Sequence, residues 1–285
     1  MPHPLRLGLK NSGQDTTIQG LRDVWRIADE AGFDHVWDFD HLASIGPVGP
    51  ERPVYEGWTL LAAIAQATRR VRLGAMVTGN TYRHPALLAK MAVTVDHLSN
   101  GRLEFGIGAA WAEVEHQMYG IEGLDHRVGR LRESLKAIIS LWTEDRTTLD
   151  GNYYQFKDAI ANPKPIQKPR PPIWIGAGGA QMMSLVAEYA DVWNCAGAAT
   201  PEDAAEKSRA LDEACVKVGR DPGKVRRSIQ HQSDGQDRAR LLDLVGRYLE
   251  VGFTEQIIYC QGPDHARSAA AVAEALPELR GALVH

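Results

Sequence analysis

The sequence predicts an α/β fold of the (β/α)8 type, the TIM barrel, in which eight parallel strands form a closed sheet surrounded by helices. Short aliphatic and β-branched runs alternate along the 285 residues with longer segments whose apolar residues recur at helical spacing. The alternation repeats eight times, whereas an open doubly wound sheet usually interrupts it with edge strands or a second domain. One barrel domain over residues 1–285 is therefore expected.

Each expected strand is short and precedes a helical segment that carries the chain back to the start of the next parallel strand. The strands are expected at 5–10 (LRLGLK), 35–40 (HVWDFD), 71–77 (VRLGAMV), 103–108 (LEFGIG), 172–176 (PIWIG), 191–195 (DVWNC), 226–231 (RRSIQH) and 255–260 (EQIIYC). The helices are expected at 16–31, 56–68, 84–98, 126–143, 180–190, 201–219, 237–252 and 264–277.

Two connections are longer than the usual few residues. Residues 42–55 contain three prolines and two glycines, which predicts a loop after the second strand. Residues 144–171 contain TLDGNYYQF, typical of a small hairpin turning at Asp150 and Gly151, followed by a proline-rich approach to the fifth strand. This segment is expected to be an excursion from the barrel without a catalytic role.

The composition favours a protein that acts on a small molecule. The net charge is −4, and the chain has no long block of Lys and Arg, which argues against nucleic acid or an anionic membrane as partner. Three widely spaced cysteines predict neither a disulfide framework nor a metal site. The N-terminus lacks a signal-peptide core and no apolar run is long enough to span a bilayer, so a cytoplasmic location is expected. A homodimer is compatible with the sequence but not required by it.

Polar and small residues follow several of the expected strands, where barrel enzymes place their active sites. Asp38, Asp40 and His41 end the second strand. The third, fourth, fifth and sixth strands run into MVTGNTYRHP, GIGAAWAEVEH, WIGAGG and NCAG. A ligand lying across the barrel end needs such residues around it.

The glycine run IGAGGA at 175–180 predicts either an anion site or a tight turn. Gly176, Gly178 and Gly179 leave the backbone bare before a helix, so that amide groups at the helix N-terminus can approach a phosphate. The run is not a dinucleotide fingerprint, because Gln181 stands where the third glycine would be. The residues alone leave phosphate binding and a purely geometric role open.

The chain resembles the bacterial luciferase-like superfamily, and within it the branch that uses the deazaflavin coenzyme F420. The resemblance lies in GFDHVWDFDH (32–41), RVRLGAMVTGNTYRHPALLAKMAVTVDHLSNGRLEFGIGAAWAEVEHQMYGI (70–121), residues 130–179 and AEYADVWN (187–194). It covers roughly residues 5–230, and the last two strands are placed by pattern only.

The resemblance implies F420, or alternatively FMN, lying across the barrel with its phosphate arm toward the glycine run. It also implies a cis peptide bond between Met76 and Val77 under one face of the ring. The cofactor-binding residues it implies are Asp40, Met76, Val77, Thr78, Gly108, Gly176, Ala177, Gly178, Gly179 and Asn194. For Asn194 the alternative is simple capping of the barrel, and no metal is implied.

The candidate catalytic residues are His41, whose role the resemblance implies, and Glu115 and Trp111, which flank the same pocket after the fourth strand. His41 would move the proton that accompanies a hydride, since imidazole titrates near neutral pH, with a structural cap as the alternative. Asp40 would orient the ring, while Asp38 is expected to line the barrel. Trp111 and Glu115 are expected four apart on one face of a short helix. Trp111 would then be an apolar wall or core packing, and Glu115 a second proton handler or a surface charge.

Three functions remain open on the sequence. The first is an F420-dependent oxidoreductase that transfers a hydride between the deazaflavin C5 and a small organic substrate. The others are an FMN-dependent monooxygenase and a cofactor-binding protein without turnover. Some sugar-phosphate-oxidising relatives have a glutamate where this chain has Trp111 and a tryptophan near Ile45, which argues against a sugar-phosphate dehydrogenase. Arg83, His84 and Cys195 are expected to be structural rather than reactive.

Overall fold

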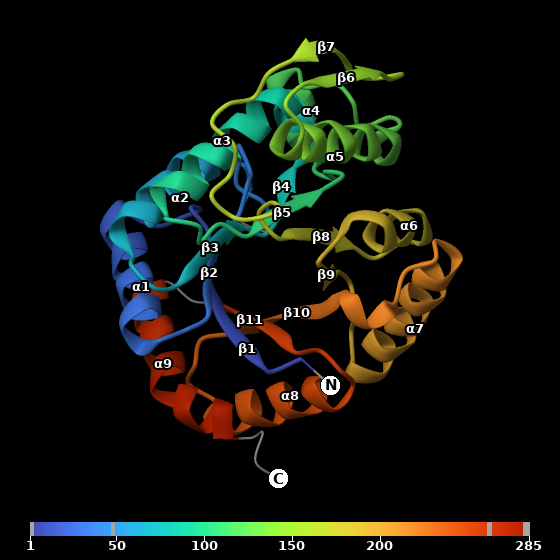
Figure 1. The fold of residues 1–285 in the computed structure, drawn as a ribbon. Coiled ribbons are helices and arrows are strands. Elements are labelled where there is room, and N and C mark those ends of the chain that lie inside the picture. The colour runs from blue at the N-terminus through green and yellow to red at the C-terminus, as the bar shows by residue number, and fades with distance from the viewer. Residues whose placement is uncertain (1–2, 47–48, 261–263, 282–285) are drawn as a thin grey trace.

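A computed structural model describes residues 3–46, 49–260 and 264–281, and shows a ring of strands enclosed by helices (Figure 1). The strands are β1 (Arg6–Lys10), β2 (His35–Asp38), β3 (Arg72–Ala75), β4 (Thr78–Gly79), β5 (Phe105–Gly108), β6 (Thr147–Asp150), β7 (Gln155–Ala159), β8 (Ile173–Ala177), β9 (Val192–Cys195), β10 (Arg226–Ser233) and β11 (Glu255–Cys260). The helices are α1 (Ile18–Ala31), α2 (Gly57–Ala67), α3 (Pro85–Leu98), α4 (Glu113–Tyr119), α5 (Arg127–Thr143), α6 (Ala180–Tyr189), α7 (Pro201–Lys217), α8 (Arg238–Glu250) and α9 (His265–Gly281).

The main sheet is parallel and has the order β3-β2-β1-β11-β10-β9-β8-β5-β4. A parallel bridge between Leu73 and Leu103 links β3 to the residues just before β5, with the Glu104 amide donating to the Leu73 carbonyl at 2.8 Å. This bridge brings the two ends of the sheet together. The predicted (β/α)8 barrel is confirmed.

The third predicted strand, 71–77, is interrupted. It divides into β3 and β4 around a cis peptide bond between Met76 and Val77, which confirms the bond expected from the resemblance. Two short pieces therefore replace one strand, because the Met76 amide pairs with the Asp38 carbonyl of β2 whereas Thr78 pairs with β5.

The barrel interior below the interruption is filled by aromatic side chains. Trp37 and Trp174 are fully buried, with ring centroids 4.6 Å apart, and Met76 packs on the same cluster. Glycines make room for them, since a Cβ at Gly74 would lie 2.5 Å from the Trp37 ring. Within residues 3–46, 49–260 and 264–281, these side chains close the barrel below, so a ligand is expected to enter from the carboxyl ends of the strands.

Two helices differ from the sequence prediction. The prediction that the last helix ends at 277 is wrong, because α9 continues to Gly281 with Pro277 inside it and with Leu276 and Leu279 buried against the core. The burial of Leu276 and Leu279 stabilises this part of α9 by more than the loss of the one backbone hydrogen bond that Pro277 cannot donate destabilises it. The expected short helix after the fourth strand exists as α4, but it starts at Glu113, so Trp111 precedes it.

The excursion between α5 and β8 contains the predicted hairpin, in which β6 and β7 pair antiparallel. Its turn consists of residues 151–154, later than predicted, because Asp150 still pairs with Gln155. It stands apart from the barrel ring beside α5 (Figure 1). Glu133 of α5 holds it by accepting hydrogen bonds from the backbone amides of residues 152–154.

A substitution at Gly106 in β5 would test how tightly the barrel wall is packed. A Cβ there would lie 2.0 Å from the Ala75 carbonyl oxygen, and backbone cannot move aside cheaply. We expect Gly106→Ala to lower the free energy of unfolding by about 3 kcal/mol. The matched control is Gly246→Ala within α8, where a Cβ meets nothing within 4 Å. This second change should stabilise the protein by about 0.5–1 kcal/mol. Urea unfolding of both variants measures the difference, and equal stabilities would contradict the packing described.

Candidate active site

A cavity of about 730 Å³ opens at the carboxyl ends of the strands. It is lined by residues from the barrel strands and their following loops, namely Lys10, Phe39, Asp40, His41, Ile45, Met76, Val77, Thr78, Gly79, Tyr82, Gly108, Ala109, Ala110, Trp111, Arg127, Val128, Gly176, Ala177, Gly178, Gly179, Ala180, Gln181, Met182, Asn194, Ala196, Gln230 and Tyr259. Every site residue expected from the sequence lies in this lining except Glu115, which is buried directly behind it.

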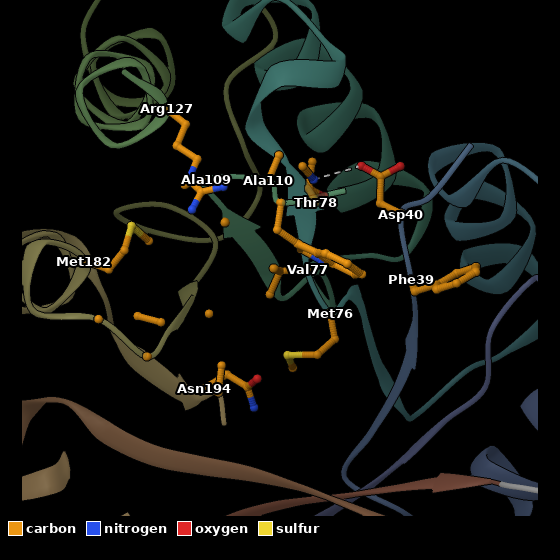
Figure 2. Close-up of a pocket in the computed structure, with 18 of the residues that line it drawn as sticks. Phe39, Asp40, Met76, Val77, Thr78, Ala109, Ala110, Arg127, Met182 and Asn194 are labelled. Atoms are coloured by element: carbon orange, nitrogen blue, oxygen red, sulfur yellow. Dashed lines mark hydrogen bonds between the residues drawn. The ribbon is translucent and has the colours of Figure 1, made fainter. Parts of the chain in front are cut away.

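Met76 and Val77 form an apolar floor (Figure 2). Val77 fits against two glycines, since a Cβ at Gly108 or Gly176 would lie 2.8 or 3.2 Å from its Cγ2 atom. The absence of a side chain at these two glycines therefore leaves the space that Val77 occupies. The neighbouring Thr78 is fully buried and accepts a hydrogen bond from the Trp58 indole at 3.0 Å.

His41 stands in the cavity wall and is held by Glu115. Its Nδ1 lies 2.8 Å from Glu115 Oε2, and the Tyr82 hydroxyl donates to the same oxygen at 2.5 Å. Glu115 Oε1 accepts from the backbone amides of Leu42 and Ala43. The prediction of a surface charge at Glu115 is wrong, because α4 turns this side chain inward and leaves it fully buried. Trp111 is 62% exposed and lies at the cavity mouth, before the start of α4. The expectation that Trp111 and Glu115 share one face of a helix is therefore wrong, and so is the alternative that Trp111 packs in the core.

The charge of Glu115 decides which nitrogen of His41 carries the hydrogen. Burial acts to raise the pKa of Glu115, but hydrogen bonds from His41, Tyr82 and the Ala43 amide outweigh it and lower the pKa to about 2. An ionised carboxylate only accepts hydrogen bonds, so His41 donates through Nδ1. Its Nε2 is then the basic atom available to a ligand.

Asp40 is held by Arg83. The two Asp40 oxygens accept from the two terminal nitrogens of Arg83 at 2.7 and 2.9 Å, and Arg83 also contacts Glu56. Burial raises the pKa of Asp40, with Arg83 acting against the shift. Asp40 also accepts from the Gly79 amide at 3.3 Å, next to the floor (Figure 2). Arg83 is structural as expected, and Asp40 positions the loop after β4 through these bonds.

Lys10 is a cavity residue that the sequence analysis missed. Its ammonium donates to the Met76 carbonyl at 3.2 Å and to Gln230 Oε1 at 2.8 Å, and lies over the Tyr259 ring. Gln230 in turn donates to Asn194 Oδ1 at 2.9 Å, so the predicted Asn194 belongs to a hydrogen-bonded polar wall. The signal that could have identified Lys10 is its place as a polar residue at the end of the first expected strand.

Stability should depend on pH through Lys10. Its pKa falls from 10.5 to about 8, because burial disfavours the ammonium more strongly than Asp38 favours it. The unfolded chain then binds more protons between pH 8 and 10.5, so this residue adds stability as pH rises through that interval, by up to about 3 kcal/mol. Wild type should therefore gain stability relative to Lys10→Met between pH 7 and 10 in urea unfolding. If the free energies of unfolding of the two proteins changed with pH in the same way, the lowered pKa of Lys10 would be contradicted.

The opposite end of the cavity is polar at the backbone. Gly178 and Gly179 precede α6, whose first residues line the cavity and whose N-terminus has no side-chain cap. A Cβ at Gly178 would lie 2.8 Å from the Ala196 carbonyl, whereas one at Gly179 would meet nothing within 4 Å. Arg127 reaches toward this region from the start of α5, near Met182 (Figure 2). Arg127 was not predicted, because it follows a loop rather than a strand.

Other polar candidates take no part in the cavity. Asp38 is buried beside it, accepts from the Gly13 amide, and agrees with the expected structural role. His84 caps α3 through the Ala86 amide. Burial raises the pKa of Cys195 to about 12. Across the described residues no group of three or more potential metal ligands occurs, and none of the helices there could cross a membrane.

Comparison with known proteins gives one consistent family. Residues 4–277 match the family described as luciferase-like monooxygenase. The F420-dependent glucose-6-phosphate dehydrogenase of Microbacterium testaceum is 35% identical over 224 residues, 77% of this chain, which spans 65% of that relative's length. The protein of the same name from Segniliparus rotundus is 32% identical over 81% of this chain and 69% of its own.

The fold also has solved counterparts. An F420-dependent secondary alcohol dehydrogenase, solved with an F420-acetone adduct, superposes with a TM-score of 0.84 over 97% of this chain and 99% of its own, at 18% identity. That identity bears on the fold alone. The family match covers nearly the whole sequence and the barrel and cavity agree with it. The chain belongs to the luciferase-like monooxygenase family.

Proposed function

We propose that this protein is an F420-dependent oxidoreductase that transfers a hydride between the deazaflavin C5 and a small organic substrate. The observation that carries the proposal is the His41–Glu115 pair, which places a proton acceptor in the cavity wall beside the Met76–Val77 floor. The relatives named F420-dependent dehydrogenases support the choice of cofactor.

The residues present fit the cofactor. Met76 and Val77 offer an apolar surface on which a flat ring can rest, with Gly108 and Gly176 closing tightly behind Val77. The uncapped N-terminus of α6 and the guanidinium of Arg127 offer donors for a phosphate at the other end. Gly178 and Gly179 are exposed there, so the backbone can be approached closely.

The protein contributes positioning and a proton path. When bound, the deazaflavin supplies a carbon that accepts or gives a hydride. His41 Nε2 takes the proton released by the substrate, because its Nδ1 hydrogen is committed to ionised Glu115. Asp40 fixes Gly79 and the loop beside the floor. Trp111 covers the mouth next to His41, with the two ring centroids 5.6 Å apart.

Equilibrium titration with F420 and FMN tests the assignment. We expect F420 to bind at least tenfold more tightly than FMN, a difference of about 1.4 kcal/mol or more. The fluorescence of the protein and of the added cofactor, F420 or FMN, follows each titration. FMN binding tenfold more tightly than F420 would replace the proposal by the monooxygenase function, and tight F420 binding without turnover of any substrate would indicate a binding protein.

A further inference from the structure

The part of the cavity next to His41 is apolar. Phe39 and Trp111 both contact the imidazole, with ring centroids 5.0 and 5.6 Å from it, and Ile45 lines the same cavity. Trp111 is 62% exposed although it is one of the largest apolar side chains of the molecule. An exposed indole at a cavity mouth is suited to cover an apolar ligand.

The charged groups around His41 are acidic or already paired. Glu115 is ionised at neutral pH and contacts the imidazole directly. Arg83, the cation behind this wall, is shared between Asp40 and Glu56. A phosphate dianion against His41 would therefore face a carboxylate without a free cation to neutralise it.

The cations of the cavity lie elsewhere. Among the lining residues that the structure describes, Lys10 and Arg127 alone carry a full positive charge. Lys10 is bonded to the Met76 carbonyl and Gln230 on the polar wall, and Arg127 extends from α5 near Met182 and Ala109 (Figure 2). The remaining stretches of the chain, 1–2, 47–48, 261–263 and 282–285, contain no Lys or Arg in the sequence.

We propose that the substrate bound against His41 is an uncharged, mainly apolar alcohol, or the matching carbonyl compound in the reverse direction, and not a sugar phosphate. The inference rests on the proposed function. In the oxidation, the C–H bond of the carbinol carbon breaks and its electron pair leaves as hydride to the bound deazaflavin. The hydroxyl proton passes to His41 Nε2, and the C–O bond becomes C=O. The substrate is oxidised by two electrons and the cofactor is reduced by two.

A matched set of ligands tests the substrate class. It contains 2-pentanol, 2-octanol, glucose 6-phosphate, and 4-hydroxypentanoate, which replaces one terminal methyl group of 2-pentanol by a carboxylate. Ligand-observed NMR measures binding with and without F420, and loss of F420 absorbance measures kcat/KM. We expect kcat/KM for an uncharged alcohol to exceed that of both anions at least 100-fold, and the alcohols to bind more tightly than the anions when F420 is bound.

Variants locate the apolar contact. Trp111→Ala should lower kcat/KM for 2-octanol at least tenfold, chiefly through KM, and weaken its binding in the NMR experiment. The control is Met118→Ala, an equally exposed apolar residue of α4 outside the cavity lining, which should change neither.

Three results would overturn the inference. They are a preference for glucose 6-phosphate, a preference for 4-hydroxypentanoate, which would make Lys10 the carboxylate anchor, and failure of every alcohol and ketone with F420 bound. Absence of F420 binding contradicts the proposed function instead.

Discussion

Replacing His41 by Ala is expected to lower turnover by about 10²–10⁴ while leaving the F420 dissociation constant within about twofold of wild type. The reason is that Nε2 acts on a proton that moves in the transition state, so its loss affects kcat more than ground-state binding. Steady-state kinetics and fluorescence titration of the same preparation measure both quantities.

Asp40→Ala provides the contrast. Asp40 holds Arg83 and the Gly79 amide beside the floor, so its loss should weaken cofactor binding as well as turnover. Full turnover by His41→Ala would identify the histidine as a structural cap, and the proton would then have to go to water or Glu115.

Glu115→Gln is expected to lower turnover at least 100-fold. The carboxylate accepts hydrogen bonds from His41, Tyr82 and two backbone amides, and the pKa of about 2 keeps it ionised. A neutral amide has one oxygen acceptor and an NH2 group with two donors in place of two oxygen acceptors, so it can present an N–H to His41 Nδ1 and move the imidazole hydrogen to Nε2. That tautomer cannot take the substrate proton.

The control is Glu113→Gln, two residues earlier on the exposed face of α4, which should leave turnover unchanged. NMR of the imidazole nitrogens distinguishes the two tautomers directly. If Glu115→Gln kept both the wild-type tautomer and the wild-type rate, the orienting role of Glu115 would be contradicted.

Much of this arrangement could be predicted because a parallel barrel brings strand ends together wherever they lie in the sequence. His41, Met76 and Gly178 are far apart along the chain, yet each follows a strand and therefore meets the same cavity. The cis bond came from the family resemblance, whereas the break after Ala75 was not predicted, since periodicity alone indicates an unbroken strand there.

The remaining features depend on side-chain directions and packing that sequence spacing does not encode. The Asp40–Arg83 pair joins residues 43 positions apart across two loops. Arg127 and Lys10 enter the cavity from a helix start and from the first strand, where no motif marked them. The sequence predicts a helix that ends at Pro277, whereas burial of Leu276 and Leu279 continues it to Gly281.

The central claim is that this cavity supports transfer of a hydride to F420. The most direct test is anaerobic incubation of the wild-type enzyme and oxidised F420 with the best substrate of the panel, deuterated at the carbon that is oxidised. Mass spectrometry and NMR of the recovered cofactor locate the label. The account predicts one deuterium at C5 per substrate oxidised, at a rate independent of oxygen. Reduced F420 without deuterium, or turnover that requires FMN and oxygen, would contradict it.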